Sequence, residues 1–185
     1  VQAFSGGFID VDSVASISTG STRFEANGAG SILDLTALIS FTRTPSSNAT
    51  SYLWANGGTV QTPNLTTLSN TELRVSGAGT IDTADINSAT AADIAADTGG
   101  DISFPLLTTY AGSNVTSTIA STGAGSTVDL NIVTTWSGAT SFQTVNVQAF
   151  SGGFIDLDSV ASISTGSTRF EANGAGSTID LTALT

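Results

Sequence analysis

Six aspartates recur at one position of an internal repeat, and they are the residues of this chain best suited to chemistry. Each directly follows an aliphatic residue that comes after a glycine-rich turn. Because successive side chains of a β-strand point to opposite faces, these carboxylates face outward if the aliphatic residues face inward. Strands stacked about 4.8 Å apart would bring the carboxylates into repulsion, which bound Ca²⁺ would relieve. The ladder comprises Asp10, Asp34, Asp82, Asp129, Asp156 and Asp180.

The same ladder also has an interpretation that needs no metal. Gln61 and Ser103 take the position in two of the repeats. No tight loop gathers several carboxylates, and neither the EF-hand motif nor Gly-Gly-x-Gly-x-Asp occurs. We therefore interpret the ladder first as a solvated acidic face, keep a Ca²⁺ ladder as the alternative, and expect no other cofactor.

A second ladder places a hydroxyl group seven residues after each aliphatic residue. Facing inward, these groups could hydrogen-bond from one repeat to the next. Facing outward, beside threonines such as Thr66 and Thr134, they could form a flat surface for ordered water or ice. Because serine and threonine are mixed, we favour a structural stack. The ladder is Ser16, Ser40, Thr67, Ser88, Thr109, Thr135 and Ser162.

Catalysis is not expected from these residues. The chain has no His, Lys or Cys, so the usual general bases and covalent nucleophiles are missing. A glycosidase would need two carboxyl groups in one cleft, whereas the aspartates are spread evenly along the repeat. Most aromatic residues, Tyr52, Trp54 and Trp136 among them, fall on apolar repeat positions, which predicts packing in the core or stacking between strands rather than a carbohydrate platform.

Composition excludes several further classes of function. Fifteen acidic residues face four arginines, for a formal charge of −11. That balance argues against binding to nucleic acid or to an anionic membrane surface. No apolar stretch approaches the ~18 residues of a membrane span. With 39% hydrophobic and 10% charged residues, many of them Thr and Val, the chain is expected to fold as β-structure.

The elements that carry both ladders repeat with a short period. The aliphatic anchors are Ile9, Leu33, Val60, Ile81, Ile102, Val128, Ile155 and Ile179. Another aliphatic residue follows each anchor after five positions, an apolar residue usually follows after eight, and a short strand such as 23–26 precedes each glycine turn. Such units bury their apolar residues only by stacking. We predict an all-β, right-handed parallel β-helix (β-solenoid) of about eight rungs of 21–27 residues, with three short strands per rung.

Two segments are less regular. A β-sandwich would not explain the in-phase positions, and residues 90–96 align with strands although their composition suits a helix. The excursion Thr42–Ser51 is polar and contains Pro45, so it is predicted to be a surface loop. It is also the best candidate for a binding patch that interrupts the rungs.

A long period encloses the short one. Residues 1–39 return as residues 147–185 with four differences in 39 positions. We expect 1–146 to be one solenoid module of about six rungs and 147–185 to begin a second, near-identical module, with no separate domains. The chain has no initiator Met, so we expect a segment of a longer protein. Its open ends would be covered by the next module or by another copy, end to end.

The units "SGGFIDLDSVASIS" and "GAGSTIDLTALT" resemble the β-strand repeats of giant secreted or cell-surface bacterial proteins, notably those of planctomycetes. They are more distantly similar to filamentous-haemagglutinin-like adhesins. The resemblance implies an extracellular structural protein that forms a fibre, stalk or filament shaft. The alternative is an adhesin shaft that binds Ca²⁺, glycan or ice through an outward ladder.

Overall fold

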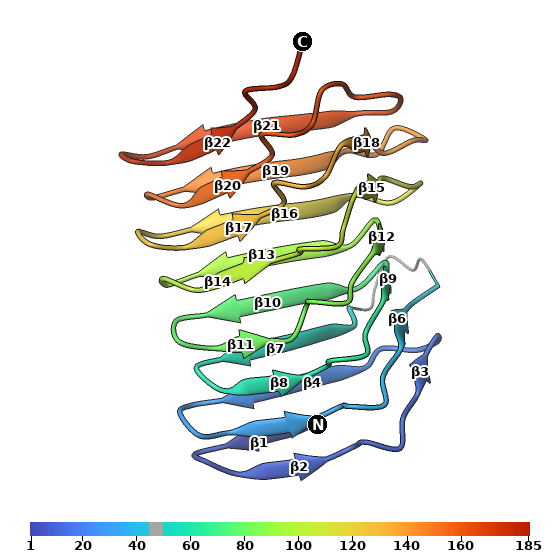
Figure 1. Ribbon diagram of the computed structural model, residues 1–185, viewed down its shortest axis with the longest axis vertical. Helices are drawn as coiled ribbons and strands as arrows, with labels where there is room; N and C mark the ends of the chain where they lie inside the picture. Colours follow the sequence, from blue (N-terminus) through green and yellow to red (C-terminus); the bar gives the residue numbers. More distant parts are fainter. Residues whose placement is uncertain (45–49) are drawn as a thin grey trace.

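The protein is a β-solenoid in the computed structural model, which describes residues 1–44 and 50–185. Twenty-two short strands wind upward from the N-terminal rung to the C-terminal rung, and the strands pair in parallel (Figure 1). These residues contain no helix, and therefore none that could cross a membrane. The predicted fold class is confirmed. Right-handed winding stays a prediction, in line with nearly all parallel crossovers.

One side of the solenoid, here called the wide face, is a single eight-stranded sheet. It contains the third strand of each rung, including β13, where composition alone suggested a helix. Inward and outward residues alternate along most of its strands. The strands are, in spatial order, β1 (Gln2–Phe4), β4 (Arg23–Asn27), β7 (Tyr52–Asn56), β10 (Glu72–Ser76), β13 (Asp93–Asp97), β16 (Ser117–Thr122), β19 (Val145–Phe150) and β21 (Thr168–Asn173).

The anchor strands form a second side, the anchor face, as two four-stranded sheets in succession. All eight predicted anchors lie in these strands, and partners such as Ile9 and Leu33 or Val128 and Ile155 are in register. The lower sheet holds β2 (Phe8–Asp10), β5 (Ile32–Asp34), β8 (Thr59–Gln61) and β11 (Thr80–Ile81). The upper sheet holds β14 (Asp101–Ser103), β17 (Thr127–Asp129), β20 (Phe154–Asp156) and β22 (Thr178–Asp180).

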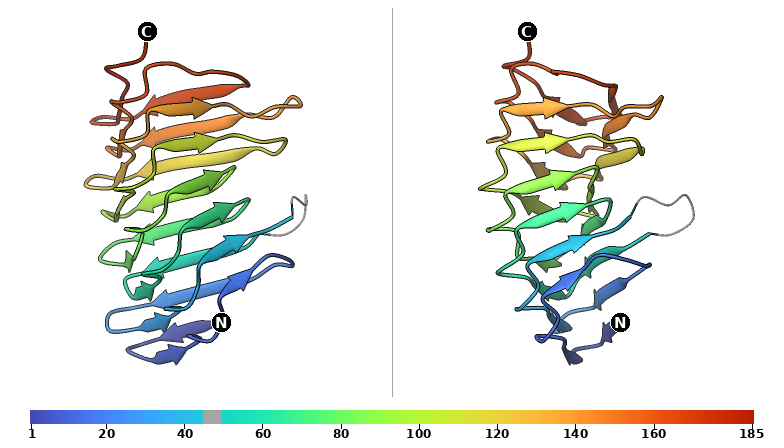
Figure 2. Two further views of the ribbon diagram at one scale, coloured as in Figure 1. Left: turned by 45° about the vertical axis from the view of Figure 1, so that its right-hand side comes forward. Right: turned by 90° about the vertical axis from the view of Figure 1, so that its right-hand side faces the viewer.

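The remaining side, the third face, is a six-stranded sheet (Figure 2). Its inward positions are the apolar residues predicted eight places after each anchor. They stack in register, with Phe41 on Leu68 and Tyr110 on Trp136. The strands are β3 (Ser16–Ile17), β6 (Ser40–Thr42), β9 (Thr67–Ser69), β12 (Ser88–Thr90), β15 (Thr109–Ala111) and β18 (Thr135–Ser137).

The corners between the anchor face and the third face are built by the aliphatic residues five places after each anchor. Leu38, Leu65 and Val133 are fully buried there. The backbone N–H of Leu38 donates to the carbonyl of Leu35, which closes a turn, and the same bond recurs in the other rungs. Full burial of such a side chain contributes about 1.5–3 kcal/mol, so the corners are part of the core rather than connecting loops.

The glycine corners, between the wide face and the anchor face, require close approach of stacked backbones. A Cβ atom on Gly79 would lie 2.1 Å from the carbonyl oxygen of Ala55 in the rung below. A serine ends several of these turns, and its hydroxyl adds hydrogen bonds that the sequence analysis did not predict. Ser126 Oγ donates to the carbonyl of Thr122 and accepts the N–H of Gly99 from the preceding rung. The recurring motif Gly-Ala-Gly-Ser is the sequence feature from which this serine's role could have been predicted.

Candidate functional site

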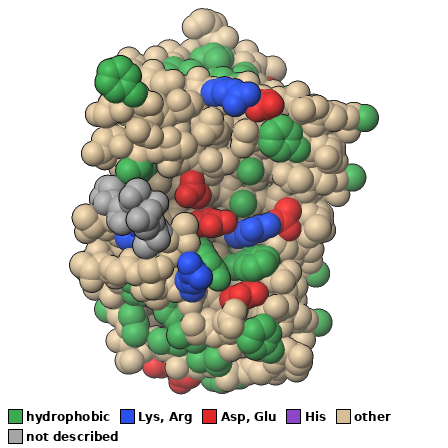
Figure 3. All heavy atoms as spheres, turned by 180° about the vertical axis from the view of Figure 1, so that it is seen from behind, with side chains coloured by type: hydrophobic (Ala, Val, Ile, Leu, Met, Phe, Trp, Pro, Cys, Tyr) green, Lys and Arg blue, Asp and Glu red, His purple; other side chains and the backbone are tan. Residues whose placement is uncertain are grey.

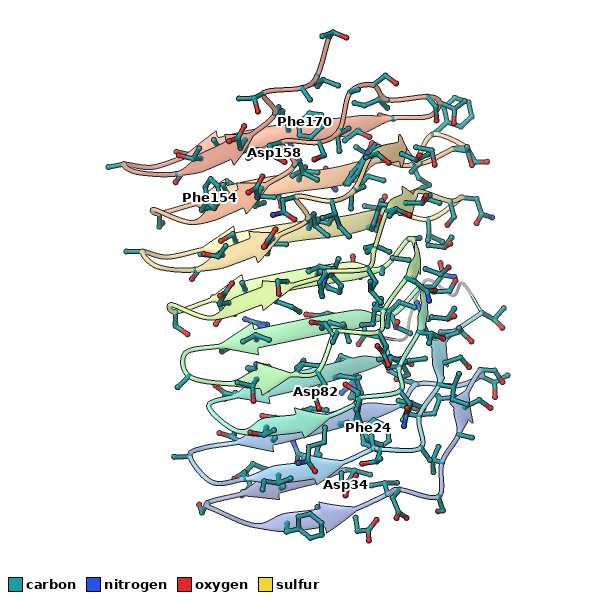
Figure 4. The ribbon with its side chains drawn as sticks, in the orientation of Figure 1. Phe24, Asp34, Asp82, Phe154, Asp158 and Phe170 are labelled. Atoms are coloured by element: carbon teal, nitrogen blue, oxygen red, sulfur yellow. The ribbon has the colours of Figure 1, made fainter. Side chains whose placement is uncertain are left out.

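The aspartate ladder is in register on the anchor face. Asp10 pairs with Asp34, and Asp129 pairs with Asp156, which pairs in turn with Asp180. Asp82 lies above Asp34 in the stack (Figure 4), with the rung of Gln61 between them. Gln61 and Ser103 interrupt the ladder as the sequence predicts. The predicted juxtaposition of carboxylates is therefore present.

Five of these carboxylates accept a hydrogen bond from a backbone N–H of their own rung. The Oδ1 atom of Asp34 accepts the N–H of Thr36, and Oδ1 of Asp129 accepts that of Asn131, each at 3.0 Å. Asp10, Asp156 and Asp180 make the same bond two residues on. Such a bond to the second following residue forms an Asx turn. This turn connects the anchor strand to the buried corner residue. This local role explains why aspartate recurs at the position.

Repulsion between carboxylates contributes to the raised pKa of one ladder member, Asp156, and of the neighbouring Asp12. Burial raises the pKa of Asp156, and the carboxylates of Asp158, Asp129 and Asp180 raise it further. The carboxylate of Asp10 raises the pKa of Asp12. Among residues 1–44 and 50–185, however, no three acidic side chains gather closely enough to hold a metal ion. The ladder therefore presents carboxylates in a row and not in a cage.

The hydroxyl ladder lies on the outer surface of the third face. Ser16, Ser88, Thr109 and Thr135 are exposed, so the expectation of an inward-facing stack is wrong. The reason is strand alternation, because the neighbouring apolar residue takes the inward position. Threonines just before the ladder do link rungs, since the hydroxyl of Thr66 donates to the carbonyl of Ile39.

The aromatic residues divide between core and surface. Phe24, Phe41, Phe104, Tyr110 and Trp136 are buried, as predicted. Tyr52 and Trp54 instead point outward from β7, which corrects the expectation of core packing for these two. Leu53 and Ala55 take the inward positions of that strand, and this alternation was the signal available in the sequence.

Tyr52 and Trp54 belong to a cluster that interrupts the small polar surface of the wide face. This wide-face patch consists of Arg23, Glu25, Tyr52, Trp54, Glu72, Arg74, Asp93 and Asp97. Charged and aromatic side chains gather there in the space-filling view (Figure 3). In the rungs that follow directly, the same columns hold the small residues Ala95, Ala120 and Thr118, and charged residues return only at Arg169 and Glu171. The patch on β7, β10 and β13 is thus a local break in the rung pattern.

Arginine side chains organise the patch. Arg74 lies over the ring of Trp54 at 4.8 Å and bonds to Asp97, with Nη2 2.6 Å from Oδ2. Arg23 lies over the ring of Tyr52 at 5.7 Å. Trp54 Nε1 donates to Ser76 at 2.9 Å. These contacts fix the two rings beside a shallow hollow that is lined by Tyr52, Trp54, Glu72 and Arg74.

Two carboxyl groups of the patch are partly withdrawn from water. Burial raises the pKa of Asp93 to about 6, with a further upward contribution from Glu72, while the N–H of Thr118 and Arg43 oppose it. Burial also raises the pKa of Glu72. Asp93 and Glu72 are register partners on adjacent strands. Carboxyl groups with raised pKa values, beside aromatic rings and a guanidinium, are suited to binding a polar ligand that has one apolar face.

The loop that was predicted as the binding patch lies beside these strands in the chain. It joins β6 to β7, and its residues 45–49 lie outside the described residues. Arg43, at its start, donates from Nε to the carbonyl of Asn70 at 3.2 Å. The patch that the structure shows is on β4, β7, β10 and β13 instead.

Comparison with known proteins adds no relative: no family model, no curated protein and no solved structure matches the chain.

Proposed function

We propose that this chain is a segment of a rigid extracellular rod, a fibre, stalk or filament shaft, whose length comes from repeated solenoid modules. The observation that carries the proposal is the seam between the two copies of the repeat. Strand β19 continues the stack on β16 across six register pairs, and β20 continues it on β17. The start of the second copy thus extends the first without a change of architecture.

The rod would grow by a fixed length for each module. At about 4.8 Å per rung, six rungs add roughly 29 Å. The acidic ladder supports the proposal, because a row of carboxylates along one face keeps neighbouring rods apart at neutral pH. The proposal assigns the chain no catalytic role, no nucleic-acid partner and no membrane insertion.

Electron microscopy of the protein in its native material tests this proposal. We expect continuous rods with an axial repeat near 29 Å, and class averages of rods of constant width. Globular or tip-decorated particles that lack this repeat would contradict it.

A second candidate function, an adhesive shaft, is favoured by the wide-face patch alone. Its aromatic rings, guanidinium and carboxyl groups fit a carbohydrate, whose C–H face packs on rings while its hydroxyls bond to planar polar groups. Trp136→Phe would leave Trp54 as the single tryptophan. Titration with a panel of neutral oligosaccharides should then shift Trp54 emission, and Arg74→Ala should abolish the shift while Arg169→Ala leaves it. An unchanged emission spectrum up to millimolar sugar would exclude this function.

A further inference from the structure

The wide-face patch carries more negative than positive charge. Acidic side chains lie among the aromatic and arginine side chains of this face in the space-filling view (Figure 3). The carboxyl groups belong to Glu25, Glu72, Asp93 and Asp97, and the guanidinium groups belong to Arg23 and Arg74. When all of these groups are ionised, two negative charges remain in excess within the patch. Charge complementarity therefore favours a ligand that is positively charged.

Glu72 and Asp93 are neighbouring carboxyl groups within this excess. They are register partners on β10 and β13, and because paired strands lie about 4.8 Å apart, the two groups repel each other when both are ionised. Arg74 is bonded to Asp97 instead, and no salt bridge within residues 1–44 and 50–185 includes Glu72 or Asp93. Oδ1 of Asp93 accepts the N–H of Thr118 at 2.6 Å. The pair therefore offers carboxylate oxygens to a cationic group of a ligand.

A protonated amine suits this pair better than a metal ion. An ammonium group is a compact charge whose N–H donors rotate, so it can donate to both carboxyl groups at once. Ca²⁺ takes about six to eight oxygen ligands, which is more than the pair supplies. In the part of the chain that the structure describes, no third acidic side chain joins Glu72 and Asp93 in a group that could hold a metal ion. The expected cation is therefore an ammonium group.

Two aromatic rings line the same hollow as Glu72. Tyr52 is the register partner of Glu72, and Trp54 is the register partner of Arg74. The two rings meet edge to face, with centroids 6.4 Å apart and planes inclined by 77°. A pyranose ring can pack a C–H face on such rings, whereas a lysine side chain is a flexible stem without a flat face. The combination of rings and carboxyl groups therefore favours an amino sugar over a lysine of a partner protein.

We infer that the wide-face patch binds an amino sugar, with the protonated amine between Glu72 and Asp93 and the C–H face of the sugar on the rings of Tyr52 and Trp54. This assignment rests on the second candidate function, since it names the class of carbohydrate that an adhesive shaft would hold. A polysaccharide whose units carry free amino groups presents an amine and an apolar face on every unit. Such a polymer is the partner that fits the patch.

Protons on the carboxyl pair and on the amine set the pH range of binding. Burial raises the pKa of Asp93 to about 6, and burial raises the pKa of Glu72 as well. The groups that act on them are the N–H of Thr118, Glu72 and Arg43 for Asp93, and Arg74 and Asp97 for Glu72. The amine of the sugar resembles an α-amino group, which loses its proton at a pH of about 8. The preference for a charged amine should therefore be largest near pH 7 and should fall at pH 5, where Asp93 is mostly protonated.

Two sugar tetramers that differ in charge test the assignment. One is a glucose tetramer of the cellulose type, and the other has an amino group in place of one hydroxyl on each unit. In the Trp136→Phe protein, where Trp54 is the single tryptophan, its emission reports both titrations. We expect the amino tetramer to bind about tenfold more tightly than the glucose tetramer at pH 7, and this ratio should shrink at pH 5.

Removing the charges of the pair should remove the preference. Glu72→Gln and Asp93→Asn keep the size of each side chain, and in the double variant the difference between the two tetramers should disappear. Asp93→Asn should not unfold the protein, because the charge that it removes opposes folding at pH 7. Asp101→Asn is the matched control, since Asp101 is exposed on the anchor face, and it should keep the full ratio.

The outcomes separate the amino sugar from carbohydrate binding as such. A preference that is present in the Trp136→Phe protein and lost in the double variant establishes the amino sugar. Equal affinity for both tetramers, or a preference that survives in the double variant, overturns it and leaves an adhesive shaft for neutral sugars standing. No response to either tetramer overturns both. A tetralysine peptide that binds more tightly than the amino tetramer would assign the patch to a protein partner and would overturn the sugar.

Discussion

The rings of Tyr110 and Trp136 stack inside the solenoid, with centroids 4.6 Å apart and planes inclined by 20°. Both side chains also end in hydrogen bonds. The Tyr110 hydroxyl donates to the carbonyl of Ala92 at 2.8 Å, and burial raises the pKa of this phenol. Trp136 Nε1 donates to Thr168 Oγ1 at 3.0 Å. Because Thr168 belongs to the second copy of the repeat, this bond joins the stack to that copy.

Removing the Trp136 ring should be among the most damaging single changes. Trp136→Ala leaves a cavity beside Tyr110 and should lower the free energy of unfolding by about 3–5 kcal/mol. Trp136→Phe keeps a ring and should cost about 1–2 kcal/mol. Urea denaturation followed by circular dichroism measures both. Equal losses for the two variants would show that the indole bond, and not the packing of the ring, carries the stability.

The Asp93 carboxyl group should oppose folding when it ionises. Its pKa is raised to about 6, first by burial, so the folded state binds the proton more tightly than the unfolded state. Stability therefore falls as pH rises from about 4 to about 6. Asp93→Asn keeps an oxygen for the N–H of Thr118 and should stabilise the protein by about 1–2 kcal/mol at pH 7. Denaturation midpoints at pH 4, 5, 6 and 7 test this, and an unchanged slope in the variant would contradict it.

Asp97, on the same sheet, should make stability depend on pH in the opposite direction. Burial tends to raise its pKa, but hydrogen bonds from Ser76 and Arg74 outweigh burial and lower it. Its contribution is therefore present above the unfolded pKa near 4 and is lost as pH falls through the lower, folded pKa. Because Arg74 is partly exposed, Asp97→Asn should cost only about 0.5–1 kcal/mol at pH 7 and nothing at pH 2. The loss at pH 7 should shrink in 1 M NaCl, and a loss independent of salt would point to packing instead.

The ladder aspartates should be replaceable by asparagine. Asp129→Asn keeps the oxygen that accepts the N–H of Asn131 and removes repulsion with Asp156, so stability should be unchanged or slightly higher. Asp129→Ala removes the Asx turn and should cost about 1 kcal/mol. Calorimetric titration of the unmodified chain should show no heat at millimolar Ca²⁺. Heat of binding that disappears in Asp129→Asn would establish the metal ladder in place of the solvated face.

Much of the fold followed from the spacing of a few residues. All eight anchors and the apolar residues of the third face lie where their period predicts, since each must reach one shared core. Side-chain direction was harder to predict. The hydroxyl ladder and Tyr52 face outward because an aliphatic neighbour fills the inward position, and that choice depends on the register of each strand. The wide-face patch combines residues of four rungs, so no single segment of the sequence contains it.

Gly79, at a glycine corner, and Gly20, in the turn between β3 and β4, should resist substitution for different reasons. At Gly79 an added Cβ would meet the backbone carbonyl of Ala55 at 2.1 Å, and a stacked rung cannot move away without breaking its sheet. Gly79→Ala should therefore cost about 3 kcal/mol or more. Gly20 has a φ of +82° and no atom within 4 Å of an added Cβ, so Gly20→Ala should cost only about 1 kcal/mol, from backbone strain. Thermal unfolding of the two variants makes the comparison. If Gly79→Ala cost no more than Gly20→Ala, the close approach of stacked rungs would not explain why the corner at Gly79, whose φ is not positive, needs glycine.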